Sequence, residues 1–94
     1  MRVVWSAQSR RDFVEISKQY VDTDPDYPVR TIKLAEAAAR RLAVFPHLGA
    51  QVPGRPFRKL RLRPTPIILI YHVTSDRIEI ARLLHAARDW QVLL

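Results

Sequence analysis

The sequence predicts an α+β fold in which an antiparallel pair of helices packs against a small antiparallel sheet. Apolar residues recur at helical spacing in the first half of the chain and alternate with charged ones, as strands do, in the second half. The chain has 94 residues, enough for one domain (residues 1–94) in which each layer buries its apolar side against the other. The predicted element order is β-α-α-β-β-β.

The chain opens with a strand and a helix. Residues 2–5 read Arg-Val-Val-Trp, a short apolar run of β-forming residues. Ser9 has the character of a helix N-cap, with Asp12 three residues later in a variant of the capping box. The first helix is therefore predicted from about residue 10 to residue 21. Its apolar face comprises Phe13, Ile16 and Tyr20.

A second helix follows a proline-rich break. The sequence Thr-Asp-Pro-Asp-Tyr-Pro cannot continue a helix, but Pro28 suits the start of the next one. We predict that helix over residues 29–44. The short connection indicates that the two helices form an antiparallel hairpin. The inner stripe of the second helix comprises Ile32, Ala35, Ala39 and Leu42, while Arg30, Lys33, Glu36 and Arg40 fall largely outside it.

Three strands are predicted in the second half of the chain. Residues 45–56 form a loop by their proline and glycine content, and the strands span residues 57–63, 67–73 and 77–84. The middle strand is almost continuously apolar, which is typical of a central strand covered on both faces. Because tight turns join the three strands, we expect an antiparallel meander, followed by a short tail.

Composition limits the class of protein. The chain has no cysteine, which excludes disulfides and thiolate metal sites and suits a reducing cytoplasm. Its longest apolar run is far too short to span a membrane, and its N-terminus does not read as a signal peptide. The net charge of +7 favours an anionic macromolecule or an acidic protein as partner, unless it serves solubility alone. We expect a cytoplasmic protein.

Cations alternate along the first strand of the meander. Lys59, Arg61 and Arg63 should share one face of that strand. Leu60 and Leu62 should share the other face. Three like charges on one face remain solvated or meet anions. The pattern therefore indicates either a plain solvated face or recognition of phosphate or carboxylate groups, for which the arginine fork is well suited.

The end of the last strand concentrates polar and aromatic chemistry. If the strand is regular, Arg82 lies on the same face as Ile80 and Leu84. An arginine among apolar residues needs a carboxylate or a water-filled groove. Asp89 and Glu15 are candidate carboxylates. A structural ion pair and a functional role therefore both stay open for Arg82.

Four further site candidates follow directly: His85, Arg88, Asp89 and Trp90. No second histidine or carboxylate stands at metal spacing from His85, which favours a hydrogen-bonded structural histidine over a catalytic one. Arg88 and Asp89 are expected to form a weak exposed pair, and Trp90 to cover the core. The sequence has no nucleophile motif and no glycine-rich phosphate loop. The residues therefore predict no catalytic group, metal or cofactor.

Four stretches resemble the ParE branch of the RelE/ParE toxin superfamily, the toxins of type II toxin–antitoxin modules. They are V-V-W-S-A-Q-S-R-R-D-F-V-E-I (3–16), L-A-V-F-P-H-L-G (42–49), I-I-L-I-Y-H-V (67–73) and, most specific, I-A-R-L-L-H-A-A-R-D-W (80–90). The resemblance implies a helical hairpin on an antiparallel sheet and a plasmid-stabilising, growth-arresting toxin that inhibits DNA gyrase without being an enzyme. It also implies a ParD-like antitoxin as partner, through which the complex binds operator DNA.

Two alternatives remain. In the RelE branch, toxins cut messenger RNA on the ribosome, and Lys59, Arg61 and Arg88 fall where that branch carries cations. However, Ile68 stands where it has a strand arginine and Leu94 near its C-terminal tyrosine, a departure that favours ParE. The other alternative is a basic nucleic-acid-binding module, which would need aromatic residues among the cations. Under the ParE prediction, the basic strand and the chain's end form the surface for target or antitoxin.

Overall fold

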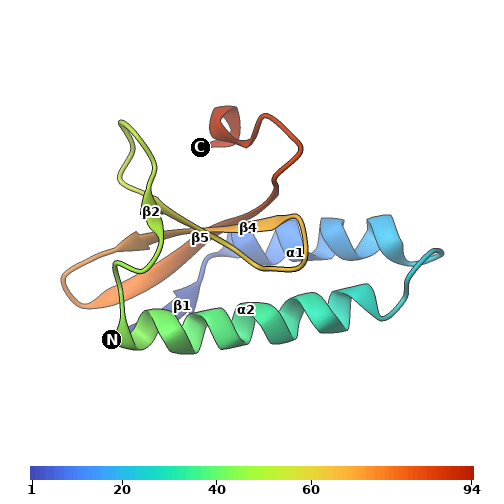
Figure 1. The fold of residues 1–94 in the computed structure, drawn as a ribbon, viewed down its shortest axis with the longest axis horizontal. Coiled ribbons are helices and arrows are strands. Elements are labelled where there is room, and N and C mark those ends of the chain that lie inside the picture. The colour runs from blue at the N-terminus through green and yellow to red at the C-terminus, as the bar shows by residue number, and fades with distance from the viewer.

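The computed structural model describes all residues from Met1 to Leu94 and confirms the α+β fold. Helices α1 (Ala7–Tyr20) and α2 (Tyr27–Val44) form an antiparallel hairpin against a five-stranded sheet (Figure 1). Neither helix combines the length and apolar composition that crossing a bilayer demands. The strands are β1 (Arg2–Trp5), β2 (Ala50–Gln51), β3 (Arg58–Arg61), β4 (Ile67–Val73) and β5 (Arg77–His85).

The sheet differs from the predicted one in two respects. Its order is β1-β5-β4-β3-β2, and β1 runs parallel to β5, so the sheet is mixed and not wholly antiparallel. A parallel pair needs a long connection, which the rest of the chain provides. The second difference is β2, which lies in the predicted loop and pairs with β3 over two residues only. The meander of β3, β4 and β5 is confirmed.

Helix α1 starts earlier than predicted because Ser6, and not Ser9, is its N-cap. The Ser6 hydroxyl oxygen accepts the Ser9 N–H at 3.0 Å. Ser6 also closes the preceding strand: its N–H donates to the Ile80 carbonyl at 3.0 Å, and its hydroxyl donates to the Ala81 carbonyl at 2.9 Å. One serine thus ends β1 and begins α1, and Asp12 belongs to no capping box.

Helix α2 begins two residues before the predicted start and ends at Val44 as predicted. Its buried stripe is rotated slightly from the predicted one, because Ile32 and Ala39 are only half-buried. At the end of the hairpin where the turn joins the helices, the Tyr20 and Tyr27 rings stack with centroids 3.9 Å apart. The residues of α2 that are buried are Tyr27, Thr31, Ala35, Ala38 and Leu42.

Strand β5 changes phase at a β-bulge. Arg82 lies opposite Ile70 and Ile80 lies opposite Tyr71, which leaves Ala81 without a partner. An extra residue reverses which face the following side chains occupy. Ile80 therefore faces the helices, whereas Arg82 faces the other side of the sheet. The condition of a regular strand, under which the two would share a face, is therefore not met.

The bulge and the alternation of β4 give the sheet two buried sides. The helix side holds twelve buried residues, including Leu69, Tyr71 and Ile80. The opposite side is covered by residues 86–94, which follow β5 and which we call the strap (Figure 1). A short 3-10 helix, Trp90–Leu93, forms its end. The cluster beneath the strap comprises Val52, Ile68, Ile70, Leu84 and Trp90.

Candidate functional site

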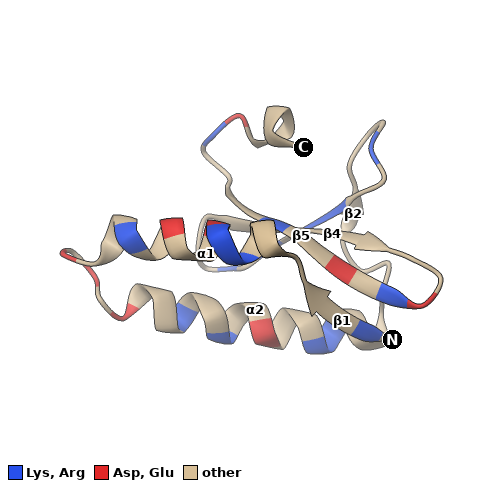
Figure 2. Ribbon diagram, turned by 180° about the vertical axis from the view of Figure 1, so that it is seen from behind, with Lys and Arg blue, Asp and Glu red and all other residues tan.

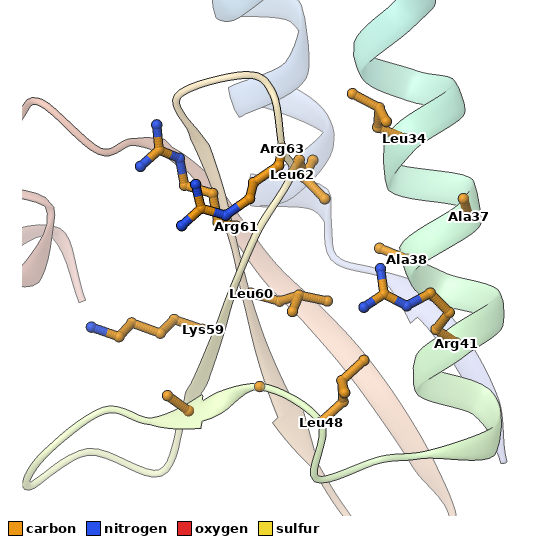
Figure 3. Close-up of a pocket in the computed structure, with 12 residues that line it drawn as sticks. Leu34, Ala37, Ala38, Arg41, Leu48, Lys59, Leu60, Arg61, Leu62 and Arg63 are labelled. Carbon is orange, nitrogen blue, oxygen red and sulfur yellow. The ribbon is translucent and has the colours of Figure 1, made fainter.

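The predicted alternation along β3 is present in the structure. Figure 3 shows Leu60 and Leu62 pointing toward α2, whereas Lys59, Arg61 and Arg63 point away from it. The three ion pairs of the molecule are Lys18–Glu15, Arg30–Asp24 and Arg82–Asp12. The basic face of β3 is thus not neutralised by any carboxylate.

Two of these cations are nevertheless held by the protein. The Arg61 guanidinium donates from Nε to the Thr65 carbonyl at 3.0 Å, across the turn to β4. The Lys59 ammonium lies 5.3 Å from the centroid of the Trp90 ring, within the range of a cation–π contact. Arg61 is therefore directed along the sheet edge, and Lys59 is directed under the strap.

A groove of about 380 Å³ runs between α2 and β3 (Figure 3). Since β2 pairs only with Arg58 and Lys59, no strand covers the edge of β3 beyond that point. The groove has aliphatic walls and a cationic rim, with no acidic residue. Its lining residues are Leu34, Ala37, Ala38, Arg41, Leu48, Gly49, Ala50, Lys59, Leu60, Arg61, Leu62 and Arg63.

One end of this groove is fixed by a buried tyrosine. The Gly49 N–H donates to the Tyr71 hydroxyl oxygen at 2.8 Å. Only glycine fits there, because a Cβ on Gly49 would lie 2.6 Å from the Lys59 carbonyl oxygen. Burial raises the pKa of Tyr71, so the phenol stays neutral at physiological pH. The loop after α2 is thereby held against β3, and the groove is preformed.

Arg82 belongs to a buried ion pair that links α1 to the end of β5. Its Nε and Nη2 donate to the Asp12 carboxylate at 2.8 and 3.0 Å. The same carboxylate accepts the Leu83 N–H at 3.0 Å, where β1 no longer covers the edge of β5. Hydrogen bonding to Asp12 raises the pKa of Arg82. The partner of Arg82 is thus Asp12, not the expected Asp89 or Glu15.

Of the residues predicted at the end of β5, Arg82, His85, Arg88 and Trp90 line one cavity, whereas Asp89 does not. The His85 Nδ1 accepts the Ala87 N–H at 3.2 Å, which agrees with a structural histidine. Arg88 and Asp89 are exposed and form no ion pair, so that expectation was wrong. Trp90 is buried and covers the core beneath the strap, as expected. No three acidic or histidine side chains are placed to hold a metal ion.

A cavity of about 310 Å³ lies where α1, β5 and the strap meet. Its walls carry both signs of charge, with Asp12 and Glu15 on α1 facing Arg82 and Arg88. Figure 2 shows acidic and basic residues close together at this end of α1. Since opposite charges balance here, this cavity is less suited to an anionic partner than the groove beside α2.

A match to a protein-family model over nearly the whole chain identifies the family. Residues 3–90 match the model of the ParE toxin of the type II toxin-antitoxin system, parDE. The chain belongs to the ParE toxin family. None of the curated proteins matches it significantly.

Solved structures agree with the ParE fold. The chromosomal ParDE toxin–antitoxin system of P. aeruginosa contains a chain 21% identical to this one, with a TM-score of 0.74 over 90% of this chain and 95% of that one. The YoeB/ParE toxin of Agrobacterium tumefaciens is 17% identical, with a TM-score of 0.62 over 90% and 98%. The E. coli DinJ–YafQ complex contains a chain 20% identical, with a TM-score of 0.55 over 93% and 96%.

Two residues of this ParE surface were missed by the sequence analysis. Asp12 was assigned to a helix cap, although its spacings of three from Ser9 and four from Ile16 place all three on the buried face of α1. Arg55 lies in a proline-rich loop and carried no signal, yet it donates to the Leu94 carbonyl at 2.6 Å. Asp12 and Arg55 each contact a residue far away in the sequence, and periodicity does not report such contacts.

Proposed function

We propose that this ParE toxin acts in the cytoplasm on DNA gyrase, arrests growth by inhibiting it, and breaks no bond itself. The observation that carries the proposal is that the basic residues lie beside apolar surface, both along the groove between α2 and β3 and beneath the strap. Lys59 lies against Trp90, and Ile68 is buried beneath the strap. Such a surface is suited to binding another protein.

The same geometry argues against RNA cleavage. A ribonuclease needs cations that converge on one phosphate and stabilise the charge of its transition state. The resemblance assigned that role to Lys59, Arg61 and Arg88. Here Lys59 contacts the strap, Arg61 contacts a turn, and Arg88 is exposed on the strap itself. The three differ in partner and in environment, which favours the binding function.

Gyrase inhibition has a direct test. With purified toxin, gyrase, plasmid DNA and ATP, we expect linear plasmid to accumulate, whereas toxin and DNA without gyrase should leave the plasmid intact. A translating ribosome extract with the same toxin should contain uncut messenger RNA. Codon-specific cuts in that extract, with gyrase unaffected, would replace this proposal with the RelE-type activity.

We further propose that the cognate ParD-like antitoxin places an acidic, amphipathic segment in the groove between α2 and β3. The aliphatic walls can bury apolar side chains, and Arg41 on α2 complements carboxylates. Arg61 and Arg63 lie on the other face of β3, where alternate side chains of an extended segment would reach them (Figure 3). The open edge of β3 offers backbone groups to an extended segment. Operator DNA would then be bound through the antitoxin.

Ala37→Glu should weaken this antitoxin complex. Ala37 lines the groove from α2, and a carboxylate there would face an acidic segment in a partly desolvated site. Like charges in an interface cost several kcal/mol, so we expect a loss of about 2 kcal/mol or more, roughly thirty-fold in Kd, by calorimetry. The control is Val29→Glu, on an exposed part of α2 outside the groove. Equal affinities of both variants for the antitoxin would exclude the groove as the antitoxin-binding site.

A further inference from the structure

The strap is held down by three cations, of which only Arg82 also meets a carboxylate side chain, that of Asp12. Trp90 is its one buried side chain, at 7% exposure, whereas Val92 and Leu93 are exposed. The contacts that hold it are Arg55 Nη1 to the Leu94 carbonyl at 2.6 Å, Arg82 Nη1 to the Leu93 carbonyl at 3.0 Å, and Lys59 Nζ over the Trp90 ring at 5.3 Å.

The strap contributes no acidic side chain to these contacts. Hydrogen bonds to carboxylates are about twice as strong as those to neutral carbonyls. The strap's only acidic side chain, Asp89, is exposed and forms no ion pair. Neither Arg55 nor Lys59 forms an ion pair with an acidic side chain, so both have donors for the carboxylate of a bound segment. A segment with acidic side chains would hold the same cations more strongly.

We propose that the strap occupies a second binding site on this protein, and that an acidic peptide segment with one bulky apolar side chain displaces it. The apolar side chain would replace Trp90 over Ile70 and Leu84, and the carboxylates would take Arg55 and Lys59. This site lies on the side of the sheet opposite the helices, away from the groove wall formed by α2 (Figure 1). The inference stands independently of the gyrase proposal.

The composition of the covered cluster favours a peptide over a nucleic acid. Single-stranded nucleic acids bind through aromatic side chains on which bases stack. Beneath Trp90 the buried cluster is aliphatic: Val52, Ile68, Ile70 and Leu84. The half-buried Phe57 is engaged edge-on with His72. An aliphatic site that holds one tryptophan side chain also fits one leucine or phenylalanine side chain of a peptide.

Trp90 fluorescence reports the displacement. In the full-length Trp5→Phe variant, Trp90 is the only tryptophan. The probe is a seven-residue peptide with one leucine flanked on each side by three acidic residues, and its control has glutamine and asparagine in their place. We expect the acidic peptide to shift Trp90 emission to the red and the control to leave it unchanged. An unchanged spectrum at saturating acidic peptide would overturn the proposal.

Removing the anchor should strengthen peptide binding. If the strap is closed about nine-tenths of the time, it lowers the apparent affinity about ten-fold, and Trp90→Ala should restore that factor. Lys59→Ala should weaken binding, whereas Lys33→Ala, on the exposed side of α2, should not. Weaker binding by Trp90→Ala in a folded protein, or equal effects at both lysines, would contradict the displacement.

Hydrogen exchange tests the same step without any substitution. The acidic peptide should deprotect the Trp90 and Leu94 amides, which are bonded to carbonyls within the strap, while the β4 amides stay protected. Increased protection of the strap amides would mean that the peptide binds on top of it and would overturn the proposal. Release of the strap by an eight-nucleotide RNA, but not by the peptide, would also overturn it and assign the surface to nucleic acid.

Discussion

Asp12→Ala is expected to lower the free energy of unfolding by about 3 kcal/mol or more, since breaking a buried ion pair costs about 3–5 kcal/mol. The carboxylate of Asp12 is 9% exposed and the side chain of Arg82 21% exposed. Its removal leaves both the guanidinium and the Leu83 N–H without their acceptor. Urea unfolding followed by circular dichroism measures the change.

Two matched variants separate the charge from the hydrogen bond. Asp12→Asn keeps an acceptor for the Leu83 N–H but loses the ionic contact, so its cost should be intermediate. Glu15→Ala removes an exposed carboxylate one turn further along α1, where an ion pair contributes little. A loss below about 1 kcal/mol for Asp12→Ala would mean that water replaces the carboxylate and that α1 is anchored elsewhere.

Leu69→Ala should be more costly than Ile70→Ala, although both side chains are fully buried neighbours on β4. Leu69 faces the helices and Ile70 faces the strap. The cost of such a truncation is about 2–5 kcal/mol and depends on how far the surroundings can collapse. Each helix packs through several buried side chains, whereas the strap has one buried side chain, Trp90. We expect the cost of Leu69→Ala to lie near the upper end of that range and the cost of Ile70→Ala near the lower end.

Thermal and urea unfolding of the two variants give this comparison. A lower cost for Leu69→Ala would show that the strap is packed as firmly as the helices. It would also weaken the proposal that the strap is displaced. Near-equal values, within about 0.5 kcal/mol, would place the two sides of the sheet in a single cooperative core.

Local patterns predicted the elements that depend on local physics. The alternation around Leu60 and Leu62 and the apolar run of β4 were sufficient for two strands, and the end of α2 at Val44 followed from the proline and glycine beyond it. The strand β2 was not predictable, because it is two residues long and has no periodicity. The Ser6 cap was missed because Ser9 offered the same local signature.

The site was predictable in composition but not in arrangement. A single unpaired residue, Ala81, decides which side of the sheet Arg82 occupies, and no pattern in the sequence marks a bulge there. The pairing of Arg82 with Asp12 joins residues 70 positions apart. Trp90 was correctly expected to cover the core, because a large apolar residue after a strand has few other places to be buried.

The place of β5 in the sheet has a consequence for when the protein can fold during its synthesis on the ribosome. β5 is the last strand to be synthesised, yet it lies between β1 and β4. Until it emerges, the N-terminal strand has no neighbour and Asp12 has no arginine. Contacts so distant in sequence also slow folding. The sheet of the nascent polypeptide is therefore incomplete until the final strand has left the ribosomal tunnel.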